Sequence, residues 1–483
     1  MARDSAGAAI PLFALVLFGA LGIGAITWGT SLETFGLGRA FAFFLPLLIY
    51  GFVLLSHSDP LRFGVTTLLL LLPVLGVVMP PARLQLTVFD VVALLVSVLL
   101  LARALGGAKI DLVPVRYAMW PLLLFLPAVP MALDPARAFN EWWHWLLLYA
   151  VFVALFHYLQ DAQWRQRFYR YLALGLLVSA AFVIVQKLTG VNLMLYQERS
   201  ASIADGILIQ RGSGLFQDPQ KAGQFIAVWA GVLAVLLARG ALTDRWARSF
   251  AFIALTLTVP ALLFTVSRLA LVGGLAAMLV GLTLLNRSGV AGRIMTGSIA
   301  VLLLSTAALV FITAPRMLFD LLPVETVKRF EATDESAAVR MQIWSDSWRI
   351  FTESPLVGIG PGNYQEYWMR RNPKLRRAKE AGLFVQDQPE SGYLKILYEG
   401  GAFGALGALV FLSGFVLSAL RQLRGGTEPD RAAAWAALLG LGVFLVTFAT
   451  LFTTSDARNA VTLVLLLALL APQCEAAPDV VQS

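Results

Sequence analysis

The stretch FTVSRLALVGG at residues 264–274 contains an arginine that decides how the fold is predicted. Between Ser249 and Asn286, Arg268 is the only charged residue in an otherwise apolar run. A charge at the centre of a bilayer costs about 2.5–3.5 kcal/mol on insertion scales. The run therefore predicts two helices of about 18 residues, each just long enough to cross a membrane, with Arg268 at the turn between them.

The composition of the whole chain agrees with a membrane protein. Of the 483 residues, 58% are hydrophobic and only 14% are charged, whereas soluble domains average about 25% charged residues. The first apolar run, 8–28, lacks an obvious small-residue cleavage site, so we expect it to be retained as a span. The single cysteine, Cys474, excludes an internal disulfide framework and a cysteine metal site. The net charge of +8 is attributed to cytoplasmic loops rather than to nucleic-acid binding.

The predicted fold class is an all-α polytopic membrane protein with about 12–14 transmembrane helices. Fourteen spans are expected, at roughly 8–28, 38–56, 62–80, 86–105, 117–133, 142–159, 168–187, 221–238, 249–267, 269–286, 294–314, 395–420, 432–452 and 457–472. Every second connection between these spans is basic. Because short basic loops stay in the cytoplasm, both termini are predicted to be cytoplasmic.

The two long connections fall on the opposite, periplasmic side in this topology. The expected organisation is N-terminal spans in 1–187, a periplasmic loop with Arg211 in 188–220, central spans in 221–314, a large cap loop in 315–394, C-terminal spans in 395–472, and a cytoplasmic tail in 473–483. Residues 315–391 contain as many acidic as basic residues. Since long loops translocate largely regardless of charge, its basic residues do not conflict with a periplasmic position. The balance of charges predicts a small folded cap.

Arg268 shares the predicted periplasmic face with several other polar stretches. An interfacial arginine that snorkels to the headgroups is the alternative to a functional role. The stretch QRGSGLFQDPQKAG, residues 210–223, follows Arg211 with two glycines that permit close approach of a ligand, and it leads into a helix N-terminus, which favours anions. An ordinary turn entering the membrane would have the same features.

Two further stretches belong to the cap and to its exit. In VRMQIWSDSWRIFTESPLVGIGPGNY, residues 339–364, Trp344, Trp348 and Phe351 recur at helical spacing and predict an amphipathic helix. This stripe is interpreted as packing against the membrane surface or the cap in preference to binding sugar, and PLVGIGPGNY as a tight turn. In QDQPESGYLKILYEGGAFG, residues 386–404, Glu390 stands at the start of the next span, where an acid can also serve merely to complement the helix dipole.

These stretches together resemble the O-antigen ligase and polymerase superfamily. The resemblance rests on Arg211 with G-x-x-x-x-P, on Ser267–Arg268, on the R…W…PLxGxGxGxY loop and on xSGYLxxLxExGxxG, in that order. It covers roughly residues 205–405. It implies a GT-C-type membrane glycosyltransferase that moves a glycan from undecaprenyl diphosphate to an acceptor sugar hydroxyl. Arg211 and Arg268 are then expected to clamp the diphosphate without a metal or another cofactor, because arginine forks bind phosphate well.

The chain departs from the ligase pattern at Glu390, where ligases usually have a histidine. A carboxylate can still remove the proton from an attacking hydroxyl, so Glu390, Arg211 and Arg268 are the expected catalytic residues. Arg340, Lys221 and Tyr393, which belong to the same stretches, complete the candidate substrate-binding set. The departure favours a polymerase of exopolysaccharide or O-antigen repeat units over a ligase that acts on lipid A–core.

The expected partners are the undecaprenyl-diphosphate-linked glycan donor, a glycan or lipid A–core acceptor, the lipid bilayer and a chain-length regulator, but no nucleic acid. The expected location is the bacterial inner membrane. A flippase or transporter is the competing class. It is disfavoured because the predicted spans are nearly free of internal charges and the two halves of the chain show no convincing repeat.

Overall fold

The computed structural model describes most of the chain from the third predicted span onward. The described residues are 53, 56–76, 87–107, 113–191, 201–204, 207–216, 218–283, 334–380, 391–451 and 457–471, of which 113–115, 201–204, 207–210, 334–340 and 378–380 are described as backbone only. The predicted spans at 8–28 and 294–314, most of 38–56, and the catalytic candidate Glu390 lie outside these residues.

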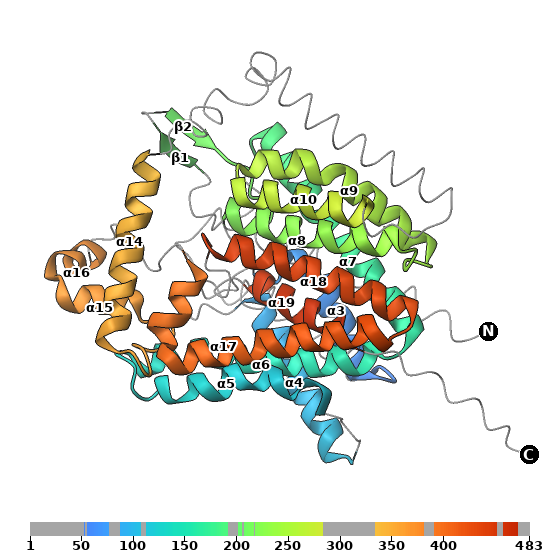
Figure 1. Ribbon diagram of the computed structural model, residues 1–483, viewed down its shortest axis with the longest axis horizontal. Coiled ribbons are helices and arrows are strands. Elements are labelled where there is room, and N and C mark those ends of the chain that lie inside the picture. Colours follow the sequence, from blue (N-terminus) through green and yellow to red (C-terminus); the bar gives the residue numbers. More distant parts are fainter. Residues whose placement is uncertain are drawn as a thin grey trace, which may run out of the picture.

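Within the described residues the protein is helical apart from one small hairpin (Figure 1). The α-helices are α3 Pro60–Leu70, α4 Val88–Leu105, α5 Trp120–Phe125, α6 Pro135–Leu159, α7 Ala162–Thr189, α8 Pro219–Ala238, α9 Arg245–Thr265, α10 Arg268–Thr283, α14 Asp334–Glu353, α15 Tyr364–Arg371, α16 Pro373–Glu380, α17 Gly392–Gly425, α18 Glu428–Phe448 and α19 Ala457–Ala468. The 3-10 helices are Leu72–Val74, Val113–Met119 and Leu126–Ala128. Strands β1 Ala201–Ala204 and β2 Ile207–Gln210 pair antiparallel, with Ala201 opposite Gln210.

Seven helices in the described part of the chain are long and apolar enough to cross a membrane, namely α4, α6, α7, α8, α9, α17 and α18. The helices α3, α10 and α19 are apolar but shorter. These elements confirm the predicted fold class, an all-α multi-pass membrane protein. The expected number of fourteen spans stays a prediction, because several of them fall outside the described residues.

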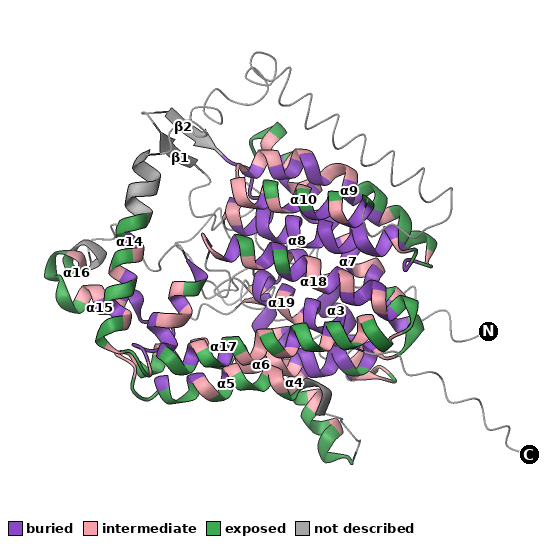
Figure 2. Cartoon of the chain, viewed as in Figure 1, coloured by how far each residue is buried: buried purple, intermediate pink, exposed green. Residues whose placement is uncertain are grey.

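Helix α8 is the centre of the bundle. It packs against α7, α9, α10, α18 and α19, and every residue of its most apolar window is buried (Figure 2). Small residues make this packing possible: a Cβ added at Gly231 would lie 2.9 Å from the Cβ of Ala277 in α10. Close approach of helix backbones through glycine and alanine is typical of membrane helix interfaces, where van der Waals packing replaces the hydrophobic drive.

The helix ends form two separate groups, as the alternation of basic loops predicted. At one end, Arg165 at the start of α7 pairs with Asp430 at the start of α18 at 2.9 Å, and Arg170 pairs with Asp244 before α9 at 2.6 Å. At the other end, the end of α7, the start of α8 and the turn between α9 and α10 lie together. Which membrane face each group occupies remains a prediction.

The predicted cap forms a lobe beside the bundle, built from α14, α15 and α16 (Figure 1). Its own small core contains Ile350, Ile359, Tyr364, Tyr367 and Tyr398, the last from α17. The buried face of α14 therefore includes Ile350. Of the aromatic stripe, Phe351 packs on this core, whereas Trp348 is 53% exposed, so its predicted packing against the membrane surface stays a prediction.

Two predicted spans have a different form in the structure. Residues 113–128, which overlap the expected span 117–133, form two 3-10 helices around the short helix α5, because Pro121 and Pro127 interrupt regular α-helical hydrogen bonding. The expected span 395–420 is part of α17, which is broken at Gly401, where φ is 58° and ψ is −152°.

Candidate active site

Arg211 lies against the end of α9. It is the first residue after β2, its side chain is buried, and its Nε donates a hydrogen bond to the carbonyl oxygen of Thr265 at 3.1 Å. The adjacent amide of Gly212 donates to the carbonyl oxygen of Phe264 at 2.9 Å. These two bonds fix both the backbone and the side chain at Arg211 relative to the C-terminal turn of α9.

Arg268 is the third residue after the end of the same helix. α9 ends at Thr265, Val266 adopts a left-handed conformation with φ 54°, and Arg268 is the first residue of α10. A β-branched residue in this region is rare, and the left-handed conformation costs roughly 1–2 kcal/mol. This tight turn, residues 265–268, is called the arginine turn below. The structure thus brings the two predicted clamp arginines to one turn, as the sequence predicted.

The first turn of α8 packs on the arginine turn and carries Lys221. Asp218 caps α8, since its carboxylate accepts hydrogen bonds from the amides of Gln220 and Lys221. A Cβ added at Gly223 would lie 3.0 Å from the Cβ of Ser267, so α8 and the arginine turn are in close contact. The side chain of Lys221 is largely buried. Arg211, Lys221 and Arg268 therefore all lie at or beside the arginine turn, and we call these three residues the cationic cluster.

The two glycines after Arg211 have a role other than the one expected. A Cβ at Gly212 would lie 3.0 Å from Cγ1 of Val183 in α7, and one at Gly214 would lie 2.9 Å from Cγ2 of the same residue. The expectation that these glycines permit approach of a ligand was wrong in this respect. They allow the segment to pack against α7, because its backbone approaches that helix too closely for a side chain.

Three buried residues that hold this segment were not singled out from the sequence. Gln186 of α7 accepts from the amides of Ser213 and Gly214 at 2.8 and 2.6 Å. At the start of α19, Arg458 donates to the carbonyl oxygen of Leu215, and Asn459 donates to that of Lys221. A signal was present for Arg458, which is a charge at the edge of an apolar run, as Arg268 is.

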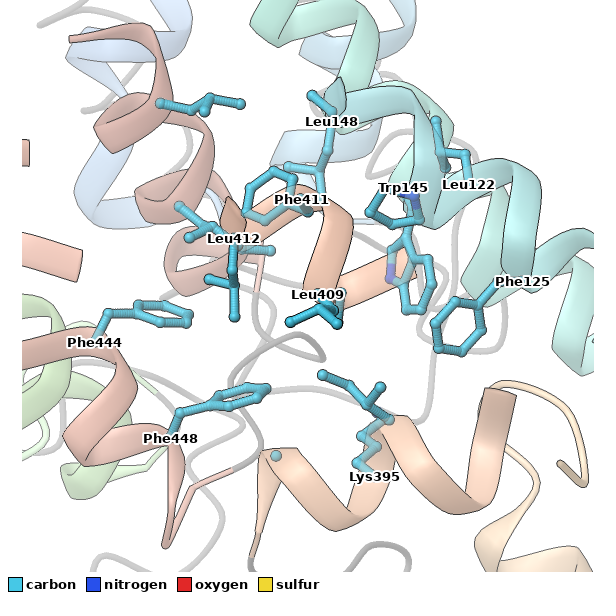
Figure 3. Close-up of a pocket in the computed structure, with 18 of the residues that line it drawn as sticks. Leu122, Phe125, Trp145, Leu148, Lys395, Leu409, Phe411, Leu412, Phe444 and Phe448 are labelled. Atoms are coloured by element: carbon cyan, nitrogen blue, oxygen red, sulfur yellow. The ribbon is translucent and has the colours of Figure 1, made fainter. Parts of the chain in front are cut away.

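An apolar cavity of about 470 Å³ lies among α5, α6, α17, α18 and α19. Phe444 and Phe448 of α18 face Phe125 and Trp145 across it, and Lys395 lies at one end (Figure 3). Its remaining walls are leucine, isoleucine, alanine and further aromatic side chains, with Glu399 beside Lys395. This shape and lining suit a hydrocarbon chain.

Helix α18 lines the cavity and also packs against α8, the helix that carries Lys221. Gln224, one turn beyond Lys221 in α8, donates to the carbonyl oxygen of Phe444 and, at 2.7 Å, to the hydroxyl of Thr447. Phe444 itself lines the cavity. At the start of α19, Asn459 contacts Lys221, and the next residue, Ala460, also lines the cavity. A cationic site and an apolar site thus lie next to each other.

Tyr393 belongs to the cavity. It lines the cavity wall, its hydroxyl donates to the carbonyl oxygen of Leu445 at 2.7 Å, and its ring meets Phe448 edge to face at 5.3 Å. Tyr393 is therefore placed at the apolar cavity. Glu390 lies outside the described residues, two positions before the start of α17, so its expected role as base stays a prediction.

Arg340 belongs to the cap helix α14, in the part described as backbone only, so its expected role in substrate binding stays a prediction. Helix α14 packs against α17. Among the residues that the structure describes, no group of three or more His, Cys, Asp and Glu side chains is placed to hold a metal ion. Whether the reaction needs a metal is a separate question, and the expected metal independence stays a prediction.

The cap meets α17 at the break near Gly401. The amides of Ile359 and Gly360 donate to the carbonyl oxygens of Tyr398 and Glu399 at 2.8 and 3.0 Å. The buried carboxylate of Glu399 accepts from the amide of Gly362 at 2.8 Å and lies 3.6 Å from Nζ of Lys395. The PLVGIGPGNY turn thus satisfies polar groups that the helix break leaves open, a role that its glycine pattern alone did not predict.

Comparison with known families covers the later part of this site. No curated protein matches the chain. Residues 251–409 match the family model described as O-antigen ligase. The matched segment includes α9, the arginine turn, α10, the cap helices and the first half of α17 with its break. It contains Arg268, Arg340, Glu390 and Tyr393 of the predicted site, whereas Arg211 and Lys221 precede it. Over residues 251–409, this match confirms the predicted resemblance to the O-antigen ligase and polymerase superfamily.

Proposed function

We propose that this protein transfers a glycan from undecaprenyl diphosphate to a sugar hydroxyl of an acceptor, and that it polymerises repeat units of an exopolysaccharide or O-antigen. The observation that carries the proposal is the convergence of Arg211, Lys221 and Arg268 beside an apolar cavity. A lipid-linked donor has the same two parts, an anionic diphosphate and a long hydrocarbon chain.

The reaction would proceed by displacement at the anomeric carbon of the donor. The acceptor oxygen forms the new bond to this carbon while the bond from the carbon to the diphosphate oxygen breaks, and the electron pair leaves with the diphosphate. Negative charge on the leaving group rises during this step. Arginine forks already in place stabilise that charge without reorganisation, so they act most strongly in the transition state. The proton of the acceptor hydroxyl passes to a base, for which Glu390 is the candidate.

The apolar cavity supports the choice of a polyprenyl carrier. Each methylene group transferred from water to such a site contributes about 0.8 kcal/mol. A chain that is already dissolved in the bilayer gains much less, so here the cavity serves to orient the carrier. With Tyr393 and Phe448 in its wall and α18 shared with α8, a chain in the cavity would direct its head toward the cationic cluster. The cluster would face the periplasm of the bacterial inner membrane.

A second candidate is ligation of the glycan to lipid A–core, which the description of the matching family favours. The two reactions share the donor and differ in the acceptor. Purified protein supplied with a defined undecaprenyl-diphosphate oligosaccharide would give a ladder of products from the donor alone if it is a polymerase. If it is a ligase, a product would form only when lipid A–core is added.

The same assay tests the cationic cluster. Arg211→Ala and Arg268→Ala should each lower the transfer rate by about 10²–10³-fold, as loss of one donor to a developing anion does in other enzymes. Lysine at either position should restore part of the rate, because it keeps the charge but lacks the fork. Arg248→Ala, an exposed arginine at the opposite end of the bundle, is the matched control. Normal transfer rates in both alanine variants would contradict the proposal that these arginines bind the diphosphate.

Two further tests address the base and the membrane side. Glu390→Gln should lose roughly 10²–10⁴-fold in rate while still binding the donor, and near-normal turnover would exclude this carboxylate as the base. A reporter fused at Lys379 should be periplasmic and one fused at Arg245 cytoplasmic. A cytoplasmic reporter at Lys379 would place the site on the wrong face.

A further inference from the structure

The first turn of α19 contains an arginine that is completely buried. Arg458 has no exposed side-chain surface. One of its terminal nitrogens donates to the carbonyl oxygen of Leu215, and its guanidinium carbon lies 4.0 Å from the centre of the Phe216 ring. Leu215 and Phe216 follow Arg211 by four and five residues. The guanidinium therefore binds the chain four to five residues after Arg211.

The same segment is held at two other places. The side-chain oxygen of Gln186 in α7 accepts hydrogen bonds from the amides of Ser213 and Gly214. The side-chain amide of Asn459 donates to the carbonyl oxygen of Lys221 at 3.3 Å. Together with Arg458, these contacts anchor the backbone on both sides of residues 215 and 216. A segment without regular secondary structure is thus fixed by side chains from α7 and α19.

The side chain of Arg458 lies against Gly76, where there is no room for a larger residue. A Cβ added at Gly76 would lie 2.7 Å from Nε and 2.9 Å from Cζ of Arg458. The guanidinium thus occupies a narrow space that Gly76 and the ring of Phe216 both border. Only a flat group can donate in its plane and stack on a ring at the same time, a combination that lysine cannot reproduce.

We propose that Arg458 is a positioning residue for the cationic cluster, which holds the Arg211–Phe216 segment so that Arg211 and Lys221 can act together with Arg268 on the donor diphosphate. This inference rests on the proposed function. Because Arg458 acts through the segment and not on the donor itself, its replacement should misplace Arg211, and so weaken both donor binding and stabilisation of the leaving diphosphate.

Two variants disturb this contact from opposite sides. Arg458→Lys keeps the charge but loses the planar guanidinium that contacts Leu215 and Phe216. Gly76→Ala keeps Arg458 but adds a Cβ in the space that its guanidinium occupies. Gly442→Ala, at a position in α18 where an added Cβ meets no atom within 4 Å, is the matched control. If Arg458→Lys does not fold, Gly76→Ala carries the test alone. Two measurements are needed: the Kd for undecaprenyl diphosphate with the KM and kcat of glycan transfer, and hydrogen exchange at the amides of Ser213, Gly214 and Phe216.

Both variants should raise the Kd for undecaprenyl diphosphate and lower kcat/KM by about 10–100-fold, the usual effect of losing a hydrogen bond to a charged group. Part of this loss should appear in kcat, because a misplaced Arg211 stabilises the leaving diphosphate less well. Exchange at the three amides should become faster. Unchanged kcat/KM and exchange in either folded variant would overturn the proposal, as would faster exchange with unchanged kcat/KM, or a fall in kcat/KM with unchanged exchange. If the parent protein binds no undecaprenyl diphosphate, the proposed function fails and the inference fails with it, whereas the exchange result still shows whether Arg458 anchors the segment.

Discussion

Helices α8 and α17 begin close to the candidate site and differ in almost every other respect. The most apolar window of α8 is 100% buried, whereas only 22% of the corresponding window of α17 is buried. α8 is continuous, while α17 is broken at Gly401 and lines the cavity. The comparison teaches that the two substrate parts have different needs. A diphosphate needs cations held in fixed positions, whereas a hydrocarbon chain needs an adaptable apolar wall.

The largest expected effect comes from one substitution made in both helices. Leu236→Ala in α8 removes a completely buried side chain, and Leu417→Ala in α17 removes one that is 53% exposed. A cavity in a packed core costs about 2–5 kcal/mol, whereas surface substitutions usually remain within about 0.5 kcal/mol. Thermal unfolding of the purified protein in a fixed detergent should show a large loss for the first variant and almost none for the second. Equal losses would contradict the contrast between the two helices.

A smaller effect is expected at the break in α17. Gly401 has φ 58°, and a Cβ there would lie 2.4 Å from the carbonyl carbon of Leu356. In Gly401→Ala, strain of roughly 1–3 kcal/mol, from a backbone conformation that is essentially confined to glycine, adds to this clash. The amides of Ala402 and Phe403, which donate to Pro355 and Leu356, should then exchange faster.

Gly425→Ala at the far end of α17, where an added Cβ meets no atom within 4 Å, serves as the control for this strain. It should leave the exchange of both amides unchanged. If Gly401→Ala also left that exchange as it is in the parent protein, the cap would not depend on the break.

The smallest effect concerns pH at the opposite end of the bundle. Partial burial raises the pKa of Asp244, but the hydrogen bonds from Arg170 and the amide of Ala247, with the charge of Arg170, outweigh it and lower the pKa below its ordinary value. The resulting stability is present at neutral pH and is lost as pH falls through the lowered pKa. Because the pair is partly exposed, we expect less than about 1 kcal/mol.

Unfolding measured between pH 7 and pH 3 should lose part of its acid sensitivity in Asp244→Asn. Arg170→Gln should lose part of the acid sensitivity as well, since without the arginine the pKa of Asp244 is no longer held as far below its ordinary value. An identical pH dependence in the parent protein and in Asp244→Asn would show that this pair does not contribute.

The sequence predicted the features that depend on composition and charge. A single arginine in an apolar run was enough to place the turn at 265–268, because two spans could form only on either side of it. The order of the motifs predicted that Arg211 and Arg268 would share one site. The alternation of basic loops predicted which helix ends would lie together.

Features that depend on packing between distant segments could not be predicted in this way. Gln186 and Arg458 act on a segment that lies 27 and 243 residues away along the chain, respectively, and no local pattern indicates either contact. Gly401 lies in a run that reads as a continuous apolar helix. Its break is stable only because Pro355 and Leu356 accept the hydrogen bonds of the amides beyond it.

That break also has a consequence for the order in which the protein is made. The turn that completes it, residues 355–362, precedes α17 in the chain and is synthesised first. When Gly401 leaves the ribosome, the carbonyl groups that its neighbours need already exist in the nascent cap. The second half of α17 can therefore bond to carbonyl groups that were synthesised before it. A chain whose cap is deleted would have to insert the same 34 residues without these acceptors.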